Sequence, residues 1–107
     1  MEKKSLTEEE LKPLKKQYYD LTLDLKDYRK GMMSRKFAEM TANQQERAKQ
    51  QYKFLRFALS DNFRVVYDHG AADSDMLSHA IWNGMLPLKM RWTALKELWR
   101  RRTGGEI

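Results

Sequence analysis

The segment Thr7–Lys30, TEEELKPLKKQYYDLTLDLKDYRK, decides the fold of this chain because its apolar residues recur at alternating steps of three and four. This spacing predicts one apolar stripe on an α-helix about 36 Å long, at 1.5 Å per residue. The stripe consists of Leu11, Leu14, Tyr18, Leu21, Leu25, Tyr28 and Met32. Its heptads also permit a coiled coil, but packing within a globular domain is the simpler interpretation.

Capping signals place both ends of this helix. Thr7 and Glu10 have the spacing of a capping box, in which each side chain accepts a hydrogen bond from the other residue's backbone N–H. Pro13 is expected to kink the second turn, because proline cannot donate a helical hydrogen bond. Gly31 is expected to end the helix. The following stretch, Met32–Met40, is compatible with either a short helix or a loop.

Thr41 and Gln44 repeat the capping-box pattern and predict the start of a second long helix. Its first turns are polar, and it becomes apolar from Tyr52 to Leu59. It is therefore expected to run from the surface into the core, against the stripe of the first helix. The segment Phe63–Tyr67 is rich in strand-forming residues, but a single strand would have nothing to pair with. We expect it to continue the helix or to form an extended connector.

Two shorter helices are predicted after a turn at Asp68–Gly70. Asp73 or Ser74 is expected to cap the first, which ends at Asn83-Gly84. Its expected buried face consists of Met76, Leu77, Ala80, Ile81 and Trp82. Pro87 suits the first turn of the last helix, whose apolar residues are Leu88, Trp92, Leu95 and Trp99.

The short connection between these two helices predicts that they fold over one another. On that basis Trp82, Leu88 and Trp92 are expected to share one buried cluster. Replacing Trp82 by alanine would then destabilise the protein by about 3–5 kcal/mol.

The chain length of 107 residues supports a single core. We predict an all-α domain of four or five helices over residues 7–102, with an N-terminal tail at 1–6 and a C-terminal tail at 103–107. There is no cysteine, so the core forms without disulfides. No apolar stretch reaches the ~20 residues that a membrane-spanning helix needs.

The sequence contains no recognised catalytic motif. No nucleophile lies beside a base in a recognised pattern, and no glycine-rich phosphate loop is present. Asp75 and His79 can pair on one helix face, but His69 and His79, with Asp68 and Asp75, do not have a recognised metal-site spacing. Capping by the aspartates and partly exposed histidines explain these residues better. We expect no catalytic residue, cofactor or metal site, and therefore not an enzyme.

The distribution of charged residues along the chain gives a clearer indication of function than the search for catalytic residues. The net charge is +6, and the segment from Lys89 to Arg102 carries six basic residues and one acid, Glu97. The basic residues are Lys89, Arg91, Lys96, Arg100, Arg101 and Arg102. With the interleaved tryptophans they predict a partner-binding basic helix whose partner is RNA, an anionic membrane surface or an acidic protein. The alternative is that the tryptophans belong to the core and the arginines only complement the helix C-terminus.

A short motif follows the second long helix. It reads Tyr67-Asp68-His69-Gly70, then Ser74-Asp75, then Leu77-Ser78-His79-Ala80-Ile81-Trp82. This motif resembles the ubiquinol–cytochrome c chaperone family, and the upstream Leu23–Met32 is similar to the helix that precedes the motif there. The resemblance covers about residues 21–86. Asn83 and Gly84 stand where the family has an arginine and usually an asparagine.

The resemblance implies a helical mitochondrial protein, in the matrix or on the matrix face of the inner membrane, that assists cytochrome b during assembly of the cytochrome bc1 complex (complex III). It implies activity by binding assembly factors, the nascent chain or the ribosome, and no small-molecule substrate. The motif residues that carry it are Tyr67, Asp68, Gly70, Ser74, Asp75, Leu77, Ala80 and Trp82. The same residues are also explained by the needs of the fold. A small structural subunit of a mitochondrial respiratory complex or ribosome is therefore the alternative.

Overall fold

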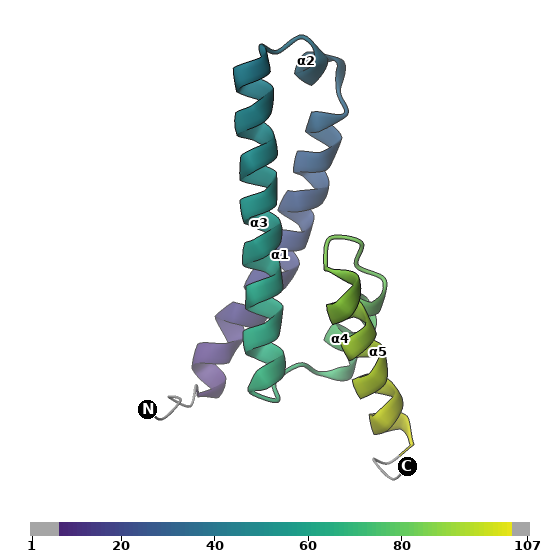
Figure 1. Cartoon of the computed structure of the whole chain (residues 1–107). Coiled ribbons are helices and arrows are strands. Elements are labelled where there is room, and N and C mark those ends of the chain that lie inside the picture. The colour runs from purple at the N-terminus through teal and green to yellow at the C-terminus, as the bar shows by residue number, and fades with distance from the viewer. Residues whose placement is uncertain (1–6, 104–107) are drawn as a thin grey trace.

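The computed structural model describes residues 7–103, which form five helices and no strand (Figure 1). The described residues are 81% helical and form a single domain, so the predicted all-α fold is confirmed. The helices are α1 (Glu8–Met32), α2 (Arg35–Ala38), α3 (Ala42–Asp68), α4 (Ser74–Ile81) and α5 (Leu88–Arg102). Residues 1–6 and 104–107 of the two expected tails lie outside the described residues.

The two long helices form a hairpin that dominates the shape. Figure 1 shows α1 and α3 side by side, joined at one end by α2, with α4 and α5 packed beside the other half. The molecule is accordingly elongated, at 54 × 31 × 22 Å. The part of the hairpin near α2 extends beyond α4 and α5.

The start of α1 follows the sequence, but its end does not. The backbone N–H of Glu10 donates to Thr7 Oγ1 at 3.2 Å, which completes the expected capping box. The helix continues through Pro13 and past Gly31 to Met32, so Gly31 is not the stop. The backbone N–H of Ser34 still bonds the carbonyl of Gly31 at 3.1 Å. The chain leaves α1 only where Ser34 caps the short helix α2.

The helix α3 begins at its predicted capping box. It includes Phe63–Tyr67, which the sequence left open as either helix or extended connector. The N–H of Gln44 donates to Thr41 Oγ1 at 3.2 Å. Phe63–Tyr67 continues the helix, which excludes the extended connector. The helical period explains this result, since it buries Phe63 and Val66 on the same face as Leu59.

Gly70 ends α3 in a Schellman motif. The N–H of Ala71 bonds the carbonyl of Val66 at 3.0 Å, and the N–H of Gly70 bonds the carbonyl of Tyr67 at 2.9 Å. This arrangement places Gly70 at φ +69°, a conformation that other residues adopt only with strain. The glycine of the motif is therefore required by the turn itself.

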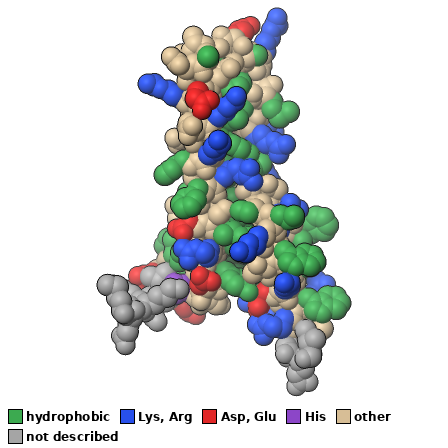
Figure 2. Space-filling model, in the orientation of Figure 1, with side chains coloured by type: hydrophobic (Ala, Val, Ile, Leu, Met, Phe, Trp, Pro, Cys, Tyr) green, Lys and Arg blue, Asp and Glu red, His purple; other side chains and the backbone are tan. Residues whose placement is uncertain are grey.

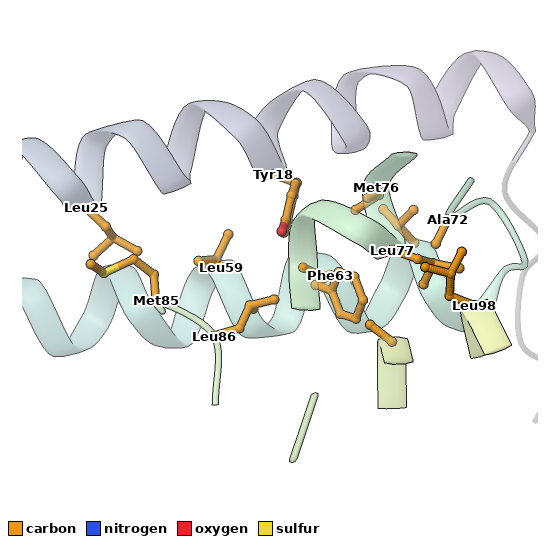
Figure 3. Packing of buried hydrophobic residues seen from close by; sticks show 13 residues of the cluster. Tyr18, Leu25, Leu59, Phe63, Ala72, Met76, Leu77, Met85, Leu86 and Leu98 are labelled. Carbon is orange, nitrogen blue, oxygen red and sulfur yellow. The ribbon is translucent and has the colours of Figure 1, made fainter. Parts of the chain in front are cut away.

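One core joins the helices in the half of the hairpin away from α2 (Figures 1 and 3). The helices α1 and α3 supply Tyr18, Leu25, Leu59, Phe63 and Val66, and α4 supplies Met76, Leu77 and Ala80. The loop after α4 adds Met85 and Leu86, and α5 adds Ala94 and Leu98. The predicted packing of the α1 stripe against the apolar end of α3 is confirmed, with Leu14 and Leu21 half-buried at its edges.

We expect Leu25→Ala to lower the free energy of unfolding by about 2–5 kcal/mol, because the side chain is fully buried and its loss leaves a cavity. Leu23, on the same helix, is 60% exposed and provides the matched control. Leu23→Ala should change stability by no more than about 0.5 kcal/mol. Urea unfolding of both variants measures the difference, and equal losses would contradict the described packing.

Candidate functional site: an exposed aromatic and basic face

The expected buried tryptophan cluster is not formed. Trp82 is 82% exposed, Leu88 75% and Trp92 57%. Trp82 is not on the buried face of α4, because the helix ends at Ile81 and Trp82 forms its C-cap. Leu95 and Trp99 are also exposed.

The reason lies in which side of α5 meets the core. Ala94 and Leu98 are buried and pack against α4. At 3.6 residues per turn, the stripe of Leu88, Trp92, Leu95 and Trp99 points about 110° away from them. The larger apolar stripe is thus turned outward, while the smaller residues let α5 approach the rest of the domain closely.

We call the exposed residues of this region the aromatic–basic face. It comprises Trp82, Leu88, Trp92, Leu95 and Trp99, with the cations Lys89, Lys96 and Arg102. Figure 2 shows hydrophobic side chains projecting along the α5 side of the molecule with lysine and arginine side chains between them. Lys96 Nζ lies 5.9 Å from the centre of the Trp92 ring, so that charge and aromatic surface are presented together.

The other three basic residues of α5 have partners inside the protein. Arg91 Nε donates to the carbonyl oxygen of Ile81 at 2.9 Å, at the C-terminal end of α4. Arg100 and Arg101 both pair with Glu97, at 2.6 and 3.0 Å. Hydrogen bonding by Arg100 holds the pKa of Glu97 below its usual value, so the carboxylate stays charged. Arg91, predicted as part of the partner-binding basic helix, thus bonds the end of α4 through its Nε.

The family-motif residues divide into two groups. Gly70, Leu77 and Ala80 serve the fold, as does Tyr67, whose half-buried ring stacks on Phe63 at 6.1 Å. The remaining motif residues are exposed, namely Asp68, Ser74, Asp75 and Trp82. Of these only Trp82 belongs to the aromatic–basic face.

Asp73 is a structural residue that the motif does not include. The backbone N–H of Met76 donates to Asp73 Oδ1 at 2.8 Å, so Asp73, and not Ser74, caps α4. Lys15 Nζ lies 2.9 Å from Asp73 Oδ2 and links α1 to this cap. Its hydrogen bond lowers the pKa of Asp73.

A polar network in the core fixes α4 and the following loop on α1. Asn83 Nδ2 donates to Tyr18 Oη at 3.0 Å and to Thr22 Oγ1 at 3.1 Å. The backbone N–H of Met85 donates to Asn83 Oδ1 at 3.0 Å. Tyr18, Thr22 and Asn83 are all buried. In the sequence, Asn83-Gly84 indicates only a turn. No local pattern predicts that Asn83 forms buried hydrogen bonds with α1.

His79 completes the network as a hydrogen-bond acceptor. Its Nδ1 lies 2.9 Å from Tyr18 Oη, which already accepts a hydrogen bond from Asn83. With the His79 proton on Nε2, the Tyr18 hydroxyl donates to Nδ1 while its oxygen accepts from Asn83. Burial raises the pKa of Tyr18 to about 12. Burial, with the nearby charge of Lys26, lowers the pKa of His79. His79 Nδ1 thus bonds Tyr18, and not Asp75, with which its i,i+4 spacing would also allow a pair.

This geometry predicts a pH-dependent stability. Because the pKa of His79 is lowered from 6.5 in the folded protein, the unfolded chain binds the proton more readily. The free energy of unfolding is expected to fall as the pH drops below that value. Urea unfolding at several pH values between 7.5 and 5.5 measures the slope. His79→Gln should flatten it, and an unchanged slope in that variant would contradict the assignment.

We also searched the described residues for a metal-binding cluster and for a membrane-spanning helix. Within residues 7–103 no three histidine, aspartate or glutamate side chains come close enough to hold a metal ion. No helix in that range is long and apolar enough to cross a bilayer.

No family model matches this chain, and no curated protein or solved structure is significantly similar to it. The resemblance to the ubiquinol–cytochrome c chaperones, which rests on the motif and on Leu23–Met32, therefore stays a prediction.

Proposed function

We propose that this protein is a non-catalytic assembly chaperone or adaptor for cytochrome b and the cytochrome bc1 complex. The observation that carries the binding role is the exposure of all three tryptophans of the chain, together with Lys89, Lys96 and Arg102, which form no ion pair within residues 7–103. Large exposed apolar patches of this kind mark interaction surfaces, where tryptophan and arginine are enriched. The client and the mitochondrial location, in the matrix or at the matrix face of the inner membrane, follow from the family resemblance.

The titratable residues of the core form structural hydrogen bonds, which supports a binding function and not a catalytic one. Tyr18 is fully buried and His79 is held by its hydroxyl group. Asn83 joins the same network and bonds the backbone of Met85. These groups connect α1 to the loop after α4, and their hydrogen bonds serve the fold. The chemistry available to a partner is at the surface, as apolar area and positive charge.

Affinity purification with quantitative mass spectrometry tests the proposal. The tagged protein should enrich cytochrome b, its assembly factors or intermediates of the bc1 complex. The variant Trp92→Ala/Trp99→Ala should lose at least about tenfold of that enrichment, as expected when two interface tryptophans are removed. The matched control is Phe54→Ala/Phe57→Ala, which removes aromatic side chains of 64% and 71% exposure from α3.

The outcomes separate the proposal from its alternatives. Enrichment of unrelated assemblies, or of none, contradicts the bc1 assignment. Retained enrichment in the tryptophan variant with loss in the α3 control moves the binding surface to α3. Equal retention in both variants leaves neither surface with a binding role.

A permanent structural subunit of a mitochondrial assembly is the second candidate. It is favoured by the exposed Phe54 and Phe57, since helical spacing turns them away from the core-facing residues Tyr52 and Leu59. A subunit embedded among neighbours would cover apolar side chains on more than one side. Stoichiometry decides between the candidates, because a chaperone leaves the mature complex whereas a subunit remains at one copy per assembly.

A further inference from the structure

We infer that the aromatic–basic face binds an anionic lipid surface, with α5 lying along the membrane and its tryptophans among the headgroups. The inference rests on the proposed function, because it names the partner of the same surface. It does not require a transmembrane segment. The protein would be held at the bilayer from one side, where a membrane-inserted client such as cytochrome b is reached.

The arrangement of α5 is that of an interfacial helix. Leu88, Trp92, Leu95 and Trp99 occupy a sector of about 60° at 3.6 residues per turn. Lys89 and Lys96 follow on one edge of this sector, and Arg102 lies on the other. Helices that lie in the membrane interface combine a tryptophan- and leucine-rich face with lysine and arginine at its sides. Their long side chains reach the phosphates while the apolar groups enter the acyl boundary.

The charge of the face determines which lipids it fits. Glu97, the single acid of α5, is 13% exposed at its side chain and is held by Arg100 and Arg101. At 100° per residue it lies on the opposite side of the helix from Trp92 and Trp99. The side turned outward therefore presents positive charge without a competing carboxylate from α5. Anionic headgroups complement it, and zwitterionic headgroups do so poorly.

The shape of the face favours lipid over a folded protein partner. Its side chains stand out from the surface as a ridge along α5 (Figure 2). Four surface hollows of 270 to 740 Å³ in the described part of the chain are lined by other residues, and a fifth, of 270 Å³, includes only Arg102 from this face. A rigid partner would need a matching socket for each tryptophan, whereas fluid lipid adapts to the ridge. Trp82, also exposed, is the C-cap of α4 and directly follows Ile81, whose carbonyl oxygen is bonded by Arg91 of α5.

Intrinsic fluorescence gives a direct test, because every tryptophan of the protein belongs to this face. The whole protein is mixed with vesicles of phosphatidylcholine containing phosphatidylglycerol, and with vesicles of phosphatidylcholine alone. We expect the emission to shift to shorter wavelength with the anionic vesicles. We also expect quenching by lipids brominated near the headgroup, and weak binding to the neutral vesicles.

Charge variants test the orientation. Lys89→Gln/Lys96→Gln keeps all three tryptophans and should weaken vesicle binding about 25-fold, at about fivefold per cation. Binding should also weaken as salt is raised. Phe54→Ala/Phe57→Ala serves as the matched control and should bind as the unchanged protein does. Circular dichroism establishes that the variants are folded.

Several results would overturn the inference. These are an unshifted emission with anionic vesicles, equal binding to neutral vesicles, or full binding by the lysine variant. A shift produced by single-stranded RNA but not by vesicles would assign the face to base stacking instead. Since the vesicles contain no protein, a failure here with intact bc1 enrichment rejects only the lipid contact. Vesicle binding without bc1 enrichment rejects only the proposed function.

Discussion

Phe63→Ala is expected to lower the free energy of unfolding by about 3–5 kcal/mol, the largest loss for a single truncation in this core. The Phe63 side chain is 1% exposed, and its ring lies 5.8 Å from that of Tyr18. It stands where α1, α3 and α4 meet (Figure 3). Removing it leaves a cavity that three helices would have to move to fill. Thermal and urea unfolding measure the loss.

Trp82→Ala provides the informative comparison. The sequence alone predicts a loss of about 3–5 kcal/mol for this variant, as for any large core aromatic. The structure leaves Trp82 82% exposed, so the expected loss is now below about 1 kcal/mol. A loss at Trp82 as large as that at Phe63 would contradict the outward position of the tryptophan. It would also remove the basis of the aromatic–basic face.

Asn83→Ala is the second substitution with a large expected effect, at about 3 kcal/mol. The amide makes three hydrogen bonds, to Tyr18, Thr22 and the backbone of Met85. A buried hydrogen bond contributes about 1 kcal/mol, and an unpaired buried donor costs more. The substitution leaves the Met85 N–H in that state. The loop between α4 and α5 should therefore loosen, which hydrogen exchange at Met85 and Leu86 would detect.

Two variants control for this result. Asn43→Ala, at an exposed position on α3, should change stability by no more than about 0.5 kcal/mol. Tyr18→Phe removes the hydroxyl group that connects Asn83 to His79, and it should reproduce part of the loss. A stable Asn83→Ala protein with unchanged exchange at Met85 would show that the network does not hold the loop.

Local signals allowed much of the helical layout to be predicted. The two capping boxes at Thr7 and Thr41 place the starts of α1 and α3, because each is completed within four consecutive residues. The stripe of α1 indicates its buried face for the same reason, since helical period and side-chain type lie in one segment. The prediction that Gly31 ends α1 was wrong. The helix continues to Met32, and the chain changes direction only at Ser34, which caps the next helix.

The candidate site could be located only in part. The concentration of positive charge between Lys89 and Arg102 is visible in the sequence, and so is its interleaving with Trp92 and Trp99. Whether those tryptophans face inward or outward is not encoded in the helix itself. An amphipathic pattern defines an apolar stripe, but it does not say whether that stripe meets the core or a partner.

The sequence by itself determined the all-α class, the helix starts and the position of the basic segment, because these depend on neighbours along the chain. The tertiary structure decided the orientation of α5 and the role of Asn83. Ala94 and Leu98 take the inner side of α5, where close packing against α4 leaves room for small and medium side chains only. The bulky tryptophans are thereby left outside. Asn83 acquires its partners from α1, more than sixty residues away, a distance that no local pattern spans.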